Sequence, residues 1–286
     1  MSNMTDYMEN KLADFARGQG LTLPTSWFFA LGSAATDSSF TELSGTGYGR
    51  VVQARSLANF ASTNGQGTTL ASTGTTHSTS NNNALNWGTS GSAWGTANCV
   101  GMFDAASGGN SWAWLDLDVP LVIGNGAAVS LPAGDVGFTL GITGGCSDYL
   151  SNKLIDLIWR AQTFAWPANL SASLYTAAPS NAGGGTEVSA ADYARVAIPS
   201  YMAAWSGTQA AGSTSASTGT GGRISNNAAV TYPIPLTNWG AVTHEALKDA
   251  NTAGNLMFWG PLAIPRTVSV GLPQSHPANS MSITFA

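Results

Sequence analysis

The segment Asp148-Tyr149-Leu150-Ser151-Asn152-Lys153-Leu154-Ile155-Asp156 repeats the segment Asp6-Tyr7-Met8-Glu9-Asn10-Lys11-Leu12-Ala13-Asp14, with a shift of 142 positions (148 − 6). Further matches follow with a shift of 145 positions (187 − 42): Glu42, Tyr48, Arg50, Val51, Trp94, Asp104, Asn110 and Trp114 return as Glu187, Tyr193, Arg195, Val196, Trp239, Asp249, Asn255 and Trp259. Matches that keep their order and spacing over half of the chain indicate a tandem duplication. We therefore predict two similar domains, residues 1–142 and 143–286.

The composition is that of a folded, β-rich protein. Two units of about 140 residues are each large enough for a hydrophobic core. Charged residues make up only 9% of the chain, against about 25% in an ordinary soluble domain. Hydrophobic residues make up 43%, with 10 Trp, 7 Tyr and 10 Phe, so the chain can bury a core and is not of the disordered class. The surface is then expected to consist mainly of hydroxyls, amides and backbone.

Charge and hydropathy exclude several kinds of partner. A net charge of −5 argues against nucleic acid, which attracts basic surfaces. The apolar runs are shorter than the roughly 20 residues that cross a bilayer, so we expect no membrane partner. The N-terminus lacks the basic and apolar regions of a secretory signal, and we expect synthesis in a cytoplasm. So few charges give weak colloidal repulsion, which favours an assembled protein.

Each unit is expected to begin with a short amphipathic helix. In the first, Tyr7, Met8, Leu12 and Phe15 recur at helical spacing. Thr5 is a suitable N-cap, and Arg17-Gly18 is a typical C-terminus. In the second unit, Ser147 is the expected N-cap.

The remainder of each unit is predicted to form strands. The paired strand segments are 27–31 with 170–175, 47–52 with 192–197, 99–103 with 242–247, and 112–114 with 256–259. Turn-rich strands at this spacing favour a mainly β fold of two β-sandwich, jelly-roll-like domains, each preceded by its helix.

Each unit also contains one long Ser/Thr/Gly/Asn segment, which we call arm 1 (residues 61–83) and arm 2 (residues 206–227). One interpretation is a flexible surface loop. The other is an extended arm that becomes ordered on a neighbouring subunit through backbone hydrogen bonds. Residues 143–145 join the units and are too few to let them move freely, so the units should pack together.

No residue pattern indicates a metal, cofactor or catalytic site. Cys99 and Cys146 are expected to be reduced structural thiols. His77, His244 and His276 have no second ligand at metal spacing and are expected to be structural. The glycine-rich runs match neither nucleotide-binding patterns nor a nucleophile elbow. We predict no catalytic, no cofactor-binding and no metal-binding residues.

The repeated carboxylates and tryptophans leave two alternatives open. A glycosidase needs two carboxylates that face one cleft. Each repeated acid has another expected role: Asp6/Asp148 and Asp14/Asp156 on helix faces, Asp104/Asp249 in Asx turns, and Glu42/Glu187 as partners of Arg50/Arg195. Exposed tryptophans could be sugar platforms. Because Trp94/Trp239 and Trp114/Trp259 repeat with the strands, they are better explained as core or interface aromatics.

The second unit resembles a family of tailed-bacteriophage virion proteins described as tail-fibre-like or minor structural proteins. The matching motifs are Ser147 to Asp156, Leu174 to Pro179, Gly183 to Val188, Tyr193 to Arg195, Trp239 to His244, and Asp249 to Gly260. The first unit is a drifted copy, with Cys99 at the position of the family histidine.

This resemblance implies a non-enzymatic structural component of a tailed-phage virion. Because the chain lacks a coiled-coil shaft or collagen-like stalk, we expect an exterior capsid cement or decoration protein, or a head-fibre protein. The alternatives are a tail fibre or receptor-facing tail-tip protein, and a glycan-binding module. The expected partners are the major capsid protein or other virion proteins. We also expect a homo-oligomer, with a trimer favoured because symmetric closure buries arms and strand edges.

Overall fold

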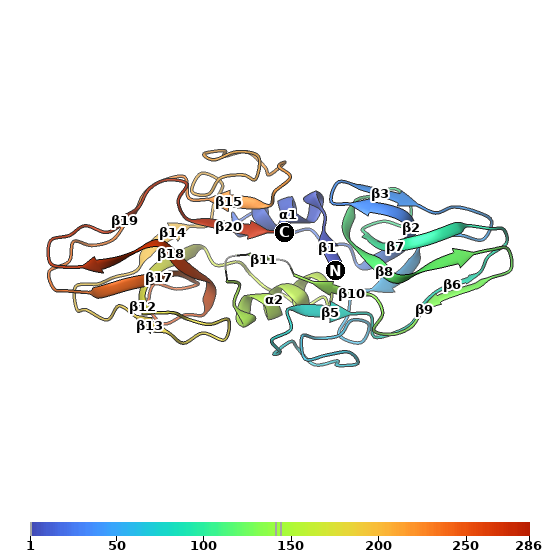
Figure 1. Ribbon diagram of the computed structural model, residues 1–286, viewed down its shortest axis with the longest axis horizontal. Helices are drawn as coiled ribbons and strands as arrows, with labels where there is room; N and C mark the ends of the chain where they lie inside the picture. The colour runs from blue at the N-terminus through green and yellow to red at the C-terminus, as the bar shows by residue number, and fades with distance from the viewer. Residues whose placement is uncertain (1, 141, 144) are drawn as a thin grey trace.

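The computed structural model describes residues 2–140, 142–143 and 145–286 (Figure 1). The elements of the first half are β1 Ser2–Met4, α1 Asp6–Ala16, β2 Ser26–Thr36, β3 Ser39–Glu42, β4 Val51–Ala54, β5 Ser78–Ser80, β6 Leu85–Thr89, β7 Gly95–Phe103, β8 Ser111–Ile123, β9 Ala128–Leu131 and β10 Gly137–Thr139. Those of the second half are β11 Ile142–Thr143, α2 Asp148–Ile158, β12 Asn169–Ala177, β13 Thr186–Glu187, β14 Val196–Pro199, β15 Arg223–Ser225, β16 Val230–Thr231, β17 Gly240–Lys248, β18 Leu256–Val268, β19 Ser275–His276 and β20 Ser282–Phe285.

Both helices begin where their capping residues predict. The Thr5 hydroxyl accepts a hydrogen bond from Met8 N, and the Ser147 hydroxyl accepts one from Leu150 N. Each cap satisfies a backbone donor that the first helical turn leaves free. Gly18 follows α1 with φ of +75°, the conformation that favours glycine after a helix.

Each half contains one large antiparallel sheet. In the first half the strand order is β1-β8-β7-β2-β3. β4 pairs with the same edge of β2 as β3 does, but at the opposite end of that strand. In the second half it is β13-β12-β17-β18, with β14 on β12. The registers correspond, since Phe28 lies opposite Phe103 and Ser171 opposite Lys248. The duplication predicted from the sequence is therefore a duplication of strand pairing as well.

Smaller sheets pack against the large ones and complete two sandwich-like halves. They are β5–β10 and β6–β9 in the first half, and β11–β20–β15 and β16–β19 in the second. The predicted mainly β class, with a helix before each β-rich half, is confirmed. Gly144, in the predicted link 143–145, lies outside the described residues.

The strands predicted over 47–52 and 192–197 begin later than expected. β4 starts at Val51 and β14 at Val196. The preceding residues form turns: Tyr48 N donates to Gly45 O at 3.1 Å, and Gly47 has φ of +80°. The alternation of side chains in these segments resembles a strand, but the positive φ of Gly47 places its backbone in a turn.

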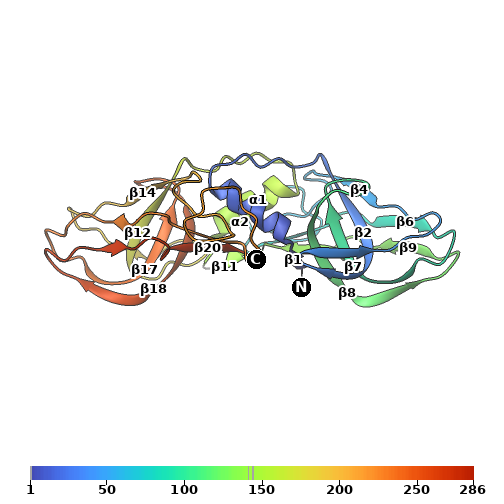
Figure 2. The same cartoon turned by 90° about the horizontal axis from the view of Figure 1, so that it is seen from above.

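The two helices lie between the β-rich halves, and the molecule is elongated with both termini near its middle (Figure 2). One hydrophobic core extends through both halves, from Met4 to Phe285. The halves therefore pack together, as the short link predicted.

Candidate functional site

Each helix packs on the arm of the other half. We call these two equivalent sets of contacts the helix–arm interlock. Helix α2 of the second half binds arm 1 of the first half. The fully buried Arg160 donates from Nε to Phe60 O at 3.0 Å and from Nη2 to Leu70 O. Arg160 also pairs with Asp156, whose carboxylate accepts hydrogen bonds from Ser72 N and Ser72 Oγ at 2.9 and 2.6 Å.

Helix α1 of the first half binds arm 2 of the second half in the same manner. The buried Arg17 donates from Nε to Trp205 O at 3.0 Å and pairs with Asp14 at 2.8 Å. The Asp14 carboxylate accepts from Ser217 N at 3.1 Å. Phe60 and Trp205, like Ser72 and Ser217, are 145 positions apart, so the two sets of contacts are equivalent.

A second pair of equivalent contacts supports the interlock. Thr63 Oγ1 donates to Asn152 Oδ1, and Thr208 Oγ1 donates to Asn10 Oδ1. The amides return hydrogen bonds to Gly74 O and Gly219 O at 3.2 and 2.9 Å. A Cβ at Gly74 would lie 2.1 Å from Thr63 O, so this close approach requires glycine.

Apolar side chains accompany these polar contacts. Trp159, at the end of α2, stacks on Phe138 of the first half with ring centroids 5.9 Å apart. Trp27 Nε1 donates to Ile158 O at 3.1 Å. Each arm is thus ordered on a neighbouring unit, and the flexible-loop interpretation is wrong. This neighbour is the other half of the same chain, and contact of the arms with a separate subunit stays a prediction.

The three histidines make structural contacts. His77 Nε2 lies 2.7 Å from Asp148 Oδ1, which joins arm 1 to α2, and His244 Nδ1 lies 2.8 Å from Thr243 Oγ1. His276 Nε2 lies 3.1 Å from Glu245 Oε2. Among the described residues, no three His, Cys, Asp or Glu side chains form a group suited to a metal ion.

Both cysteines are buried and unpaired. Burial, with a smaller contribution from Asp116, raises the pKa of the Cys99 thiol to about 11, and burial with Asp148 raises that of Cys146 to about 12. Both side chains are therefore unreactive thiols at neutral pH.

The repeated glutamates bind arginine side chains, and these arginines bind backbone carbonyls. Arg50 Nη2 donates to Glu42 Oε2 at 2.7 Å, and Arg195 Nε donates to Glu187 Oε1 at 2.7 Å, as predicted. The same arginines extend to the following turns, for example from Arg50 Nη1 to Ala105 O at 2.7 Å.

Asp104 and Asp249 begin polar turns as expected, but in place of an Asx turn, with a donor two residues on, each carboxylate bonds across the turn to a donor six residues on. Asp104 Oδ1 accepts from Asn110 N at 2.7 Å, and Asp249 Oδ1 accepts from Asn255 N at 2.6 Å. The repeated acids are thereby occupied in holding loops.

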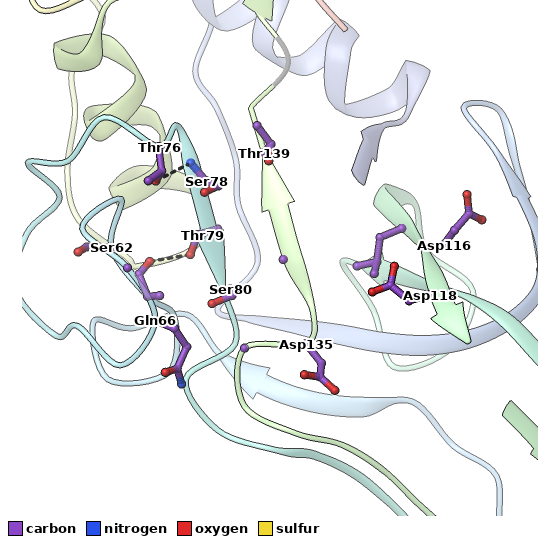
Figure 3. Close-up of a pocket in the computed structure, with 15 residues that line it drawn as sticks. Ser62, Gln66, Thr76, Ser78, Thr79, Ser80, Asp116, Asp118, Asp135 and Thr139 are labelled. Carbon is purple, nitrogen blue, oxygen red and sulfur yellow. Dashed lines mark hydrogen bonds between the residues drawn. The ribbon is translucent and has the colours of Figure 1, made fainter. Parts of the chain in front are cut away.

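An open groove of about 450 Å³ runs between β8 and the β5–β10 sheet (Figure 3). Asp116 and Asp118 lie on one side, and Asp135 lies apart from them at the start of β10. Serine, threonine and Gln66 side chains complete the lining. The groove can accept hydrogen bonds from a polar solute. In the second half, the positions equivalent to the three acids are Pro261, Ala263 and Ser280, so the acidic lining belongs to the first half only.

A smaller cavity of about 160 Å³ lies between the layers of the second half and contains Glu245 and His276. Burial raises the pKa of Glu245 to about 7, and burial together with Arg266 lowers the pKa of His276 to about 4. At pH 7 the Glu245 carboxyl is therefore protonated in about half of the molecules, while the His276 imidazole is neutral. The role of Glu245 was not predicted from the sequence. Comparing the two units could have indicated it, because the first unit has an apolar residue, Val100, where the second has this carboxylate.

The repeated tryptophans differ in burial. Trp94 and Trp239 are buried, as predicted. Trp114 and Trp259 are only partly buried, so the core does not enclose them, and the interface alternative stays a prediction. Trp259 lies opposite Ala246 on the outer face of the large sheet, and its Nε1 donates to Asn181 Oδ1 at 3.0 Å. The repeat spacing indicated a strand register but could not show which face of the sheet is covered.

Comparison with known proteins identifies the family. The chain matches the family model described as "Podophage GP4 fiber I protein gp80" twice, over residues 3–139 and 145–284. The matches cover nearly the whole chain, so it belongs to this family of podophage fibre proteins and is a virion component with a fibre-like structural role. The resemblance to a phage virion family is thereby confirmed. No curated protein matches the chain. Within the described residues, neither helix is long and apolar enough to cross a membrane.

Proposed function

We propose that this podophage fibre protein is a non-enzymatic building block on the outside of the virion, attached to the capsid as a head-fibre, decoration or cement protein. The observation that carries this proposal is the helix–arm interlock. Two copies of a module would be joined only by a short link if each helix packed on its own unit. Because each helix packs on the arm of the other unit, the halves form one body.

The interlock supports a mechanical role. Arg17 and Arg160 are buried charges that pair with Asp14 and Asp156 on their own helices, but their carbonyl acceptors lie on the opposite half, so separating the halves removes those carbonyls. It would also expose Trp159 and Trp27, which lie in a core shared by both halves. Such a joint resists bending and separation, which suits a protein anchored outside a particle.

The arrangement of the acids supports a non-enzymatic role. A glycosidase needs a carboxylic acid and a second carboxylate on opposite sides of one bond. Six of the repeated acids hold an arginine or a turn, Asp148 contacts His77, and the acids of the groove between β8 and the β5–β10 sheet do not point toward one another in Figure 3.

The location on the capsid is supported by the shape of the elements. The two helices of the described chain are eleven residues each, too short for a coiled-coil shaft. The major capsid protein is the proposed partner, with other virion proteins as alternatives and a homotrimer as the proposed assembly. The alternative is a tail fibre or tail-tip protein, which the description of the family as a fibre protein also fits.

Immunogold labelling of purified particles tests the location. We expect gold on the capsid surface and a copy number, relative to the major capsid protein, that follows the symmetry of the capsid. Labelling confined to the tail, with copies in multiples of the tail symmetry, would favour the alternative. Light scattering of the purified protein tests the trimer, and a stable monomer both in solution and on particles would contradict it.

The glycan-binding alternative is favoured by one observation, the partly exposed Trp259 beside His244, whose ring centroids lie 6.3 Å apart. An aromatic ring on an outer sheet face can stack on a sugar. Binding of host-cell glycans by the wild type, and its loss in Trp259→Ala, would support a receptor-reading role.

A further inference from the structure

The outer end of the second half exposes a cluster of apolar side chains, which we call the apolar tip. Two loops form it, residues 233–238 before β17 and residues 269–274 after β18. Ile234 is 61% exposed, Leu236 73%, Val270 61% and Leu272 46%. β18 begins beside Cys146 near the helices and runs outward to Val268, so these loops lie at the end of the elongated molecule far from the interlock (Figure 1).

Hydrogen bonds hold the two loops of the apolar tip together. Gly271 N donates to Pro235 O at 2.7 Å, and Val270 N donates to Asn238 Oδ1 at 3.2 Å. The Asp192 carboxylate accepts from Leu236 N at 2.6 Å and from Trp239 Nε1 at 3.0 Å. The Thr237 hydroxyl also donates to this carboxylate, and this hydrogen bond, followed by those from Leu236 N and Trp239 Nε1, holds the pKa of Asp192 well below its usual range. Since the loops are already ordered, binding through them would cost little conformational entropy.

The first half lacks this feature although its scaffold is the same. The residues 145 positions before those of the apolar tip are Thr89, Gly91, Asn125 and Ala127, and Gly47 stands in place of Asp192. The two loops at the corresponding end of the first half are therefore polar or small at all four positions, and the large apolar side chains exposed near that end, Val119 and Val122, lie on the strand β8 instead. The fold alone does not require apolar side chains in these loops, so the difference indicates a contact that the loops of the second half make and those of the first half do not.

The size and charge of the apolar tip limit what can cover it. Residues 232–239 and 269–274 contain no Asp, Glu, Lys or Arg, and the one carboxylate described above against these loops, Asp192, is bound to Leu236 N, Thr237 and Trp239 Nε1, so an apolar partner surface fits the exposed side chains best. The four side chains expose on the order of 450 Å², about half of the roughly 800 Å² that each partner buries in a stable interface. A flat tip-to-tip contact between two copies is therefore too small. At the other end of the molecule, Val119 and Val122 of β8 are exposed, but two side chains on one strand also fall short of the area that an end-to-end contact between copies needs.

We propose that the apolar tip inserts into an apolar socket of another virion protein and attaches the chain to the particle, leaving the first half outward. A concave socket would bury the sides of both loops as well as their ends, and so supplies the area that a flat contact lacks. This inference rests on the proposed virion location and adds which end of the molecule is anchored.

The test uses phage that carry substitutions in the full-length protein. Leu236→Asp with Val270→Asp places two charges on the apolar tip, and Leu236→Ser with Val270→Ser is the milder version in case the first does not fold. Thr89→Asp with Asn125→Asp makes the matched change at the other end. Occupancy on purified particles is measured by quantitative mass spectrometry relative to the major capsid protein, and folding by the melting temperature of each purified variant.

We expect at least a tenfold loss of occupancy for the tip variants, with a melting temperature within about 2 °C of the wild type, and normal occupancy for the control. Normal occupancy of the tip variants would overturn the proposal, as would an equal loss in the control. Dimers of the wild type that the tip variants abolish would show that a second copy is the occupant, which also overturns it. Absence of the wild type from particles would instead refute the virion location itself.

Discussion

Replacing Asp156 with alanine should release arm 1 from helix α2. In the folded protein, the Arg160 guanidinium is fully buried and Asp156 is its only carboxylate partner among the ion pairs of the described residues. Without Asp156, the charge of Arg160 has only the carbonyls of Phe60, Thr68 and Leu70 and the Ser72 hydroxyl as acceptors. Ser72 also loses the acceptor of its backbone N–H.

The expected loss of unfolding free energy is about 3–5 kcal/mol, the range for removing one partner of a buried ion pair. The loss of free energy is this large because Arg160 remains as a buried charge without a carboxylate partner. It does not measure how much the intact ion pair stabilises the fold. The double variant Asp156→Ala with Arg160→Met removes both charges and should therefore regain part of the loss. Glu42→Ala is the comparison: Glu42 is 27% exposed against 9% for Asp156, so although Arg50 is nearly buried, removing Glu42 should cost less than removing Asp156.

Urea unfolding followed by tryptophan fluorescence measures the free energies, and hydrogen exchange measures the protection of amides in arm 1. We expect faster exchange in residues 61–80 of the Asp156→Ala protein, with the strands of the second half less affected. A loss below about 1 kcal/mol, or unchanged exchange in arm 1, would refute the view that this pair holds the arm.

Three further outcomes are expected. Glu9, buried on α1, has its pKa raised to about 7 by burial and by Asp6 and Asp37. Because the folded state binds its proton more tightly, the free energy of unfolding should fall as pH rises from about 4.5 to 7. Glu9→Gln should therefore raise the free energy of unfolding by up to about 3 kcal/mol at pH 8 and change it little at pH 4. Equal effects at the two pH values in urea unfolding would contradict this. Trp239→Ala should cost about 3–5 kcal/mol and the partly buried Trp259→Ala clearly less, so equal losses of melting temperature would count against their assigned burial. Deleting residues 208–219 of arm 2 should destabilise the purified protein because it removes the three serine acceptors of the buried Arg17, at positions 213, 215 and 217, whereas an unchanged melting temperature would show that arm 2 is a dispensable loop.

Features that depend on neighbouring residues could be predicted from the sequence. The caps Thr5 and Ser147 act within one turn of their helices. The pairing of Glu42 with Arg50 joins residues eight positions apart on adjoining segments. The turns at Asp104 and Asp249 follow from a side chain that accepts from a backbone donor six residues later. Because these contacts need only local geometry, residue type and spacing were enough, and the repetition of each pattern identified the duplication.

Other features were decided by the tertiary structure. The apolar stripes of α1 and α2 would be the same whether each helix packed on its own unit or on the other, so the sequence could not show the exchange that brings Arg160 to Leu70. The partial exposure of Trp259 depends on which sheet face remains uncovered. The pairing of Glu245 with His276 joins strands of different sheets, 31 positions apart. Periodicity determines which residues share a face, but the free energy of packing between distant segments determines what that face meets.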